Sequence, residues 1–222
     1  MRRLHRMPFG AEPAENGHTR FRLWAPTAHT VHLALGEGRP PIPMQEGGDG
    51  WRELMLPAAA GTRYRYRING ELDVPDPASR FNPDDVHSAS EVMAPEAFDW
   101  KDDGWRGRPW TEAVVYELHV GTFSPEGTFG GVEARLDYLA QLGVTAIELM
   151  PVADFPGKRG WGYDGVLPFA PDAAYGRPDD LKRLVVAAHA RGLMMLLDVV
   201  YNHFGPDGNY LQDRKSTRLN SS

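Results

Sequence analysis

Residues 178–203 read "PDDLKRLVVAAHARGLMMLLDVVYNH", a helix pattern followed at once by a strand pattern. The Pro-Asp-Asp at 178–180 suits a first helical turn, where proline needs no N–H partner and negative charge favours the helix dipole. Gly192 ends the helix, and residues 193–200 form an almost unbroken apolar run, typical of a parallel strand covered on both faces. The predicted apolar stripe of the helix consists of Leu181, Leu184, Val185 and Ala188.

The same order of patterns occurs upstream. Strands are expected at residues 113–120 ("AVVYELHV") and 145–152 ("TAIELMPV"), with a helix between them at 132–143 ("VEARLDYLAQLG"). Val132, Leu136, Leu139 and Leu142 share one face of that helix, and Gly143 suits its C-terminal cap. Strand, helix, strand, helix, strand predicts two consecutive βαβ units with right-handed crossovers.

The first hundred residues follow a different period. Residues 20–25 ("RFRLWA") and 63–68 ("RYRYRI") alternate with period two, the pattern of strands with one buried and one wet face. Two further short strands are expected at 30–35 and 51–56, with turn-forming segments between them. These strands predict a small antiparallel sandwich. Residues 76–110, called the connector below, show neither period but carry several aromatics, so we expect an ordered segment.

Composition narrows the function classes. The chain has 222 residues, 24 basic and 30 acidic side chains, a formal charge of −6 and no cysteine. The sequence has no stripe of basic residues that would favour binding to nucleic acid or to an anionic membrane surface. No apolar segment approaches the roughly 18 residues of a membrane span. The absence of cysteine and of a signal-peptide pattern predicts a cytoplasmic protein. No phosphate loop, nucleophile elbow or metal-ligand spacing occurs, so no cofactor and no metal are expected.

Polar and aromatic side chains gather at the carboxyl ends of the last two predicted strands, where parallel α/β folds build their active sites. They are Trp161, Tyr163, Asp164, Asp198, Tyr201, Asn202 and His203. Rings stack on sugar faces while carboxylates and amides bind hydroxyls, so these residues favour a sugar site. The alternative to a sugar site is that these residues have structural roles: Asp198 as a buried carboxylate paired with an arginine, Asn202 as a turn residue and His203 as a packed histidine.

The chain resembles the front part of the malto-oligosyltrehalose trehalohydrolases, a family of the α-amylase superfamily of glycoside hydrolases. The segments that carry the resemblance are "PDPASRFNPDDVHSASEV", "VYELHVGTFSPEGTF", "AIELMPVADFPGKRGWGYDGV", "FAPDAAYGRPDDLKRLV" and "LDVVYNHFGPDGNYL". The resemblance implies a multi-domain fold: an N-terminal antiparallel β-sandwich over residues 1–98, then the first three β/α units of a truncated (β/α)8 TIM barrel over 99–213. It ends where "DRKSTRLNSS" begins, and residues 214–222 are expected to be an artefactual tail of adapter or vector origin.

The resemblance also implies an activity and roles for the candidate residues. The substrate would be a malto-oligosyltrehalose or another α-1,4-glucan, with hydrolysis of the α-1,4 bond next to the trehalose end. Tyr163 would stack under the sugar, His203 would bind its hydroxyls, Asp198 would orient an arginine near the nucleophile, and Asn202 would hold the loop. The further substrate-binding candidates are Trp161 and Asp164.

The catalytic carboxylates of this superfamily follow later strands, so we expect no nucleophile or acid/base in this chain and no hydrolysis by it. Two alternatives stay open. One is a glycogen branching enzyme, and the other is a non-catalytic module whose sandwich binds α-glucan.

Overall fold

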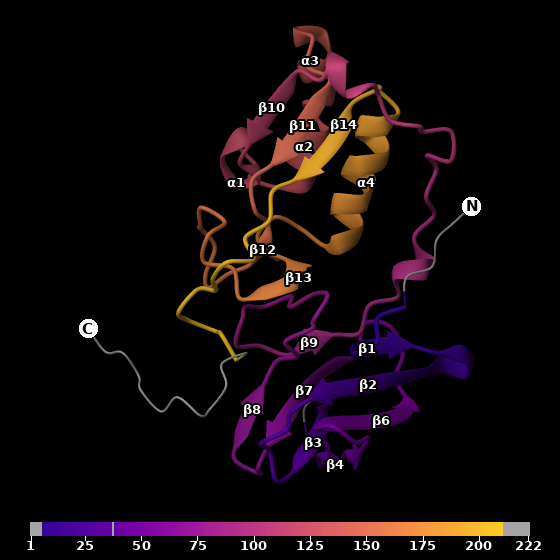
Figure 1. Cartoon of the computed structure of the whole chain (residues 1–222), viewed down its shortest axis with the longest axis vertical. Helices are drawn as coiled ribbons and strands as arrows, with labels where there is room; N and C mark the ends of the chain where they lie inside the picture. Colours follow the sequence, from indigo (N-terminus) through magenta and orange to yellow (C-terminus); the bar gives the residue numbers. More distant parts are fainter. Residues whose placement is uncertain (1–5, 37, 211–222) are drawn as a thin grey trace.

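The computed structural model describes residues 6–36 and 38–210, so the expected tail lies outside the described residues. Figure 1 shows two packed parts, with the β-sandwich below and a parallel sheet with helices above, joined by the connector. This arrangement confirms the predicted fold class. Within the described ranges, no helix has both the length and the apolar character that a bilayer crossing requires.

The sandwich consists of two antiparallel sheets. One has the strand order β1-β2-β6-β5 and the other the order β4-β3-β7-β8, with β9 also pairing with β7. The strands of the first sheet are β1 (Gly10–Pro13), β2 (His18–Trp24), β5 (Gln45–Glu46) and β6 (Trp51–Pro57). Those of the second are β3 (Val31–Leu35), β4 (Ile42–Pro43), β7 (Arg63–Ile68), β8 (Leu72–Val74) and β9 (Ser90–Glu91).

The predicted alternation decides which side chains fill the sandwich core. In β2, Phe21 is fully buried whereas Trp24, on the opposite face, is 60% exposed. In β7, Tyr64 and Tyr66 point inward, and the ring centroid of Tyr64 lies 4.9 Å from that of Phe21 in an edge-on contact. Such aromatic pairs add to the stabilisation from buried apolar area.

The connector begins inside the sandwich. Asp76 is buried and accepts hydrogen bonds from the hydroxyls of Tyr64 (2.7 Å) and Tyr66 (3.3 Å) and from the Ala78 amide (2.8 Å). Burial raises the pKa of Asp76 to about 6, although these donors oppose the rise. The hydroxyl of Ser90 accepts a hydrogen bond from the Asp76 amide (3.0 Å), so the start of the connector is fixed to β9.

The connector then passes through the short 3-10 helices η2 (Pro95–Ala97) and η3 (Trp110–Glu112). Between them Trp105 stacks on His189 with centroids 4.5 Å apart, and Asp102 Oδ2 lies 2.7 Å from His189 Nδ1. The predicted ordered connector is therefore confirmed. Two of its aromatics attach it to α4 of the second part: Trp105 stacks on His189, and the ring centroid of Phe98 lies 5.2 Å from Lys182 Nζ.

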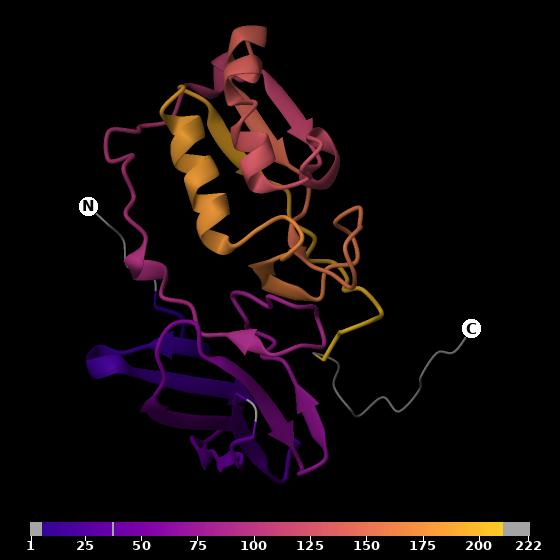
Figure 2. The ribbon, with the colours of Figure 1, turned by 180° about the vertical axis from the view of Figure 1, so that it is seen from behind.

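The second part contains three parallel strands in the order β10-β11-β14, with bounds Val115–Leu118, Ala146–Leu149 and Met194–Leu197. Its helices are α1 (Val120–Phe123), α2 (Phe129–Glu133), α3 (Leu136–Leu142) and α4 (Pro178–His189). Seen from behind in Figure 2, α4 and the α2–α3 pair lie over one face of this sheet. The two predicted βαβ units are thus confirmed.

Two details of the prediction are wrong. The single helix expected at 132–143 is two helices in the structure. The first, α2, starts at Phe129, where the Thr128 hydroxyl accepts a hydrogen bond from the Gly131 amide, and it ends at Glu133. The third strand is short and Leu197 is 49% exposed, because the described residues provide no strand beyond β14 and no helix over its open face. The predicted C-terminal cap is confirmed, since Gly143 has a φ of 91°.

A small hairpin was not predicted. The strands β12 (Ala153–Asp154) and β13 (Leu167–Pro171) pair antiparallel with a register shift between Ala153 and Asp154. A strand of two residues carries too little period-two signal to be recognised in sequence. The hairpin encloses the loop of residues 155–166, which carries three of the candidate site residues.

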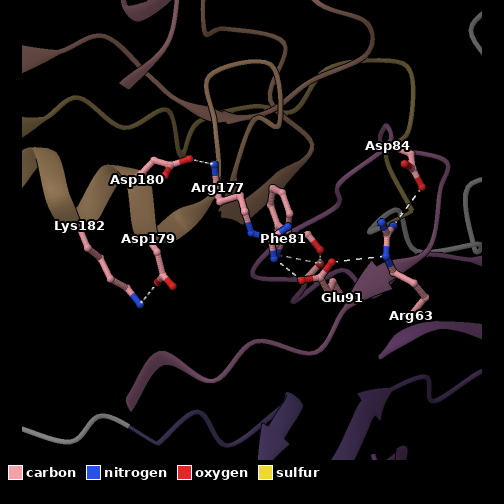
Figure 3. A network of polar contacts seen from close by, with 9 residues as sticks. Arg63, Phe81, Asp84, Glu91, Arg177, Asp179, Asp180 and Lys182 are labelled. Atoms are coloured by element: carbon pink, nitrogen blue, oxygen red, sulfur yellow. Dashed lines mark hydrogen bonds and ion pairs between the residues drawn. The ribbon is translucent and has the colours of Figure 1, made fainter. Parts of the chain in front are cut away.

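An ionic contact joins the two parts of the chain (Figure 3). Arg177, the residue before α4, bonds to the buried carboxylate of Glu91 and places its guanidinium 4.6 Å from the ring centroid of Phe81. Glu91 also pairs with Arg63 of β7 at 3.4 Å, and Arg63 with Asp84 at 3.0 Å. The carboxylate of Glu91 therefore lies between one arginine from each part.

Candidate functional site

Two loops at the carboxyl ends of parallel strands meet at the candidate site. The first is the hairpin loop of residues 155–166, and the second, residues 198–210, is called the site loop below. His203 links them: its Nε2–H donates to the Tyr163 carbonyl oxygen (2.9 Å), and its Nδ1 lies 3.0 Å from Asn202 Oδ1. The sequence thus brings together residues that are 40 positions apart.

Around this link lies an open cavity of about 570 Å³. It is lined by Tyr163, Asp198, Val199, Val200, Tyr201, Asn202 and His203. The rings of Tyr163 and Tyr201 are 46% and 78% exposed, so both present faces to solvent beside the half-buried carboxylate of Asp198. Exposed rings next to a carboxylate, an amide and an imidazole can stack on a sugar and bind its hydroxyls.

The structure brings five of the seven candidates to the cavity, and the other two, Trp161 and Asp164, are not part of its lining. Trp161 is 74% exposed and has its ring centroid 6.3 Å from that of His119, in an edge-on contact. Asp164 is exposed, and its backbone lies against Gly205 of the site loop. Neither residue lines the cavity.

The ring of His203 is already engaged by protein groups. Because Nε2–H donates to a backbone carbonyl, the imidazole fixes the position of Tyr163. Among the described residues no arginine forms an ion pair with Asp198, so its role in orienting an arginine stays a prediction. The geometry assigns His203 a share in holding the two loops together.

Sequence reasoning missed His119 and Tyr175, which extend the site towards the first strand. His119 follows β10, and its Nε2 lies 2.8 Å from the Gly160 carbonyl oxygen and 3.3 Å from the Tyr175 hydroxyl. The signal was present, since His119 is the first polar residue after an apolar strand. His119 therefore holds the hairpin loop at Gly160, whereas His203 holds it at Tyr163.

A buried pair of carboxyl groups lies under the hairpin loop. Burial, with the nearby carboxyls of Asp172 and Asp85, raises the pKa of Asp154 to about 8. Burial also raises the pKa of Asp172 to about 6, against the bonds it accepts from the amides of Ala174 (2.7 Å) and Phe155 (3.1 Å). Oδ2 of Asp154 has no partner in the part of the chain described. At neutral pH the pair holds a proton, which prevents repulsion between the two strands of the hairpin.

No group of three or more histidine, aspartate and glutamate residues within the described ranges is arranged to hold a metal ion.

Comparisons with known proteins agree with the fold described above. Residues 79–222 match the α-amylase catalytic domain, and residues 8–82 match carbohydrate-binding module 48, the isoamylase N-terminal domain. The malto-oligosyltrehalose trehalohydrolase of Deinococcus radiodurans is 52% identical over 207 residues, which cover 93% of this chain and 34% of that protein. The same enzyme of Arthrobacter ramosus is 49% identical over 197 residues, covering 87% and 34%.

A solved structure gives the same result. A Salmonella typhimurium protein assigned as an alpha amylase superposes with a TM-score of 0.89 at 51% identity, over 92% of this chain and 35% of that one. A sandwich of this type followed by parallel β/α units defines the class, a carbohydrate-binding module joined to part of an α-amylase catalytic domain. The chain belongs to the α-amylase family, and within it is a homologue of the malto-oligosyltrehalose trehalohydrolases. It spans about a third of the length of these relatives.

Proposed function

We propose that this chain provides the sandwich and one side of the substrate site of an enzyme that releases trehalose. The substrate would be a malto-oligosyltrehalose, cleaved at the α-1,4 bond next to its trehalose end. The observation that carries the proposal is the convergence of Tyr163, Asp198, Asn202 and His203 on one open cavity at the carboxyl ends of parallel strands. The similarity to trehalohydrolases over most of the chain supports this choice of substrate.

Each residue receives a role from its surroundings. The half-exposed ring of Tyr163 is the stacking surface for a glucose unit, and Asp198 is the acceptor for charged or hydroxyl groups at the floor of the cavity. His203 holds Tyr163 in place through its carbonyl, and Asn202 orients the imidazole. Trp161 extends the sugar surface beyond the cavity, and Asp164 lies at its edge.

Hydrolysis itself requires more than these residues. A retaining glycosidase needs two carboxyl groups about 5–5.5 Å apart, one as nucleophile and one as acid/base. The cavity lining contains a single carboxylate, that of Asp198. We therefore propose that this chain alone binds glucan without cleaving it, and that the catalytic pair comes from further strands.

A hybrid enzyme tests the proposal. Residues 1–210 would replace the matching segment of the Deinococcus radiodurans relative, and trehalose release from maltotriosyltrehalose would be measured. We expect release by the hybrid, a loss of most of it in the Tyr163→Ala variant, and little change in a Tyr138→Ala control, whose ring is exposed on α3. A folded hybrid that forms branched glucan from amylose, or that has no activity, would contradict the trehalohydrolase proposal.

The domain boundary at residues 98/99 is part of the proposal. Its support is that the connector is attached to the sandwich through Asp76 and β9, whereas its later residues Asp102 and Trp105 contact His189 of α4. Glucan binding by the sandwich alone is tested by retardation of residues 1–98 in a maltodextrin gel. Cytoplasmic location stays a prediction of the sequence.

A further inference from the structure

The site loop does not end at the sugar cavity. In both views of the ribbon its last part leaves the parallel sheet and reaches the connector beside the sandwich (Figures 1 and 2). Residues 201–204 are exposed, whereas Gly205 and Gly208 are buried. The exposed part that carries Asn202 and His203 is thus followed by a segment with two buried glycines.

The near anchor of this segment is Gly205. Its amide donates to the Gly165 carbonyl oxygen (3.2 Å), and a Cβ on Gly205 would lie 2.3 Å from the Asp164 carbonyl oxygen. The two loops therefore pack backbone against backbone directly after His203.

The far anchor is formed by the connector. His87 Nε2–H donates to Asp207 Oδ1 (2.8 Å), and the Tyr210 hydroxyl donates to His87 Nδ1 (2.8 Å). A single neutral tautomer of His87 satisfies both bonds, because one ring nitrogen carries the hydrogen and the other accepts. Tyr210 also packs against the sandwich core, so this end of the site loop rests on the sandwich.

Packing against Val86 supplements these exposed polar bonds. Gly208 has a φ of +77°, and a Cβ there would lie 2.5 Å from Val86 Cγ2. Val86 is fully buried and forms a small core with Val166, Leu167 and Ala170 of the hairpin. The connector therefore contacts both loops of the candidate site.

We propose that His87 and Val86 of the connector are positioning residues for the sugar site, which hold the far end of the site loop so that Asn202 and His203 keep Tyr163 at the cavity. Neither residue lines the cavity. The proposal rests on the proposed function for its consequence, which is weaker glucan binding when the anchor is broken. The mechanical part, the ordering of the loop, is independent of the ligand.

The contact between Arg177 and Glu91 in Figure 3 provides a matched control. It attaches the same connector to the start of α4 and has no bond to the site loop. Replacing Arg177 therefore weakens the packing of the two parts without removing the far anchor of the loop.

Hydrogen exchange of this chain, measured by mass spectrometry, tests the proposal. We expect His87→Ala to raise exchange of residues 199–210 by roughly three- to tenfold, since locally anchored loops exchange through local opening. Arg177→Ala should raise exchange at the start of α4 and leave the site loop unchanged. His87→Gln, which keeps one donor and one acceptor, should restore most of the protection.

A second pair of variants tests Val86. Gly208→Ala should raise exchange of the same residues, and adding Val86→Ala should reverse part of the increase by making room for the new methyl group. Unchanged exchange in both His87→Ala and Gly208→Ala, or equal effects of His87→Ala and Arg177→Ala on the site loop, would overturn the proposal.

Maltotetraose distinguishes this proposal from the proposed function. Protection of residues 199–204 by the sugar in the unmodified chain, with weaker affinity in His87→Ala, is the expected result. If the sugar protects nothing while His87→Ala still opens the loop, the sugar site is wrong and only the mechanical anchor remains. If the sugar binds equally well to both proteins, His87 does not position the site.

Discussion

The sandwich and the parallel sheet differ in how their apolar faces are covered. The two sheets of the sandwich cover one another, and residues such as Phe21, Leu33 and Tyr66 have no exposed surface. The parallel sheet is covered by helices on one face, and Val115 and Leu197 on its outer strands are 42% and 49% exposed. Only its central strand β11 is mostly buried. Equally apolar sequence runs thus reach different burial, because burial depends on what lies opposite them.

Separating the two parts would produce the largest effect. We expect residues 1–98 to unfold in one cooperative thermal transition, since the sandwich buries its own core. Residues 99–213 alone should aggregate or unfold without cooperativity, because an open sheet edge and an uncovered apolar face favour association. Circular dichroism melts and light scattering of the two pieces measure this. A soluble second piece with a sharp transition would show that its one covered face is sufficient.

A core substitution in the sandwich should come next in size. Phe21→Ala removes a fully buried ring, and we expect a loss of about 3–5 kcal/mol in the free energy of unfolding. Trp24→Ala, on the exposed face of the same strand, is the control and should lose much less. Denaturant titration of residues 1–98 measures both. Similar losses would mean that the alternation in β2 does not determine burial.

Sequence periods predicted most of the fold correctly, because each period reflects a whole face of an element. The alternation of Tyr64 and Tyr66 and the cap at Gly143 are local features, and both are confirmed. The length of β14 was overestimated, since an apolar run shows that a segment can be buried but contains no information about its neighbours.

The candidate site was predicted in part for a related reason. Tyr163, Asp198, Asn202 and His203 follow strands, and parallel strands place their ends at one edge. The bond from His203 to the Tyr163 carbonyl depends on loop conformation, which no period describes. The Asp154–Asp172 pair depends on the two-residue strand β12, so sequence alone could not reveal it.

The buried carboxyl groups of the two parts should make the stability of the fold depend on pH in different ranges. Asp76 in the sandwich has hydrogen-bond donors around it, whereas Asp154 faces the carboxyls of Asp172 and Asp85. An acid with a higher pKa in the folded state stabilises the fold at low pH, and this contribution is lost as pH rises towards the folded pKa. For Asp76 and Asp172 this contribution to stability is lost between about pH 4 and about pH 6. From about pH 6 to about pH 8, Asp154 is therefore the only one of these three carboxyl groups that still titrates.

In that window the whole chain should lose stability as pH rises, by at most about 1.4 kcal/mol per pH unit from this group. Asp154→Asn stays neutral and should remove the slope. Calorimetric melts at several pH values measure the difference. Equal slopes in both proteins would show that the hairpin does not depend on a proton held by Asp154.

The smallest effect is expected on the open side of β14. Leu197 is 49% exposed, so Leu197→Ser should change the free energy of unfolding of this chain by no more than about 0.5 kcal/mol, as at other surface positions. In the hybrid enzyme, further strands can cover this side, and the same substitution should then cost about 2 kcal/mol or more, because it places a hydroxyl in an apolar core. Denaturant titration of both proteins, each with its Leu197→Ser variant, measures this difference. A small loss in the hybrid would mean that Leu197 stays at the surface there. A large loss in the chain alone would mean that β14 is already covered, which would remove the contrast between the two parts.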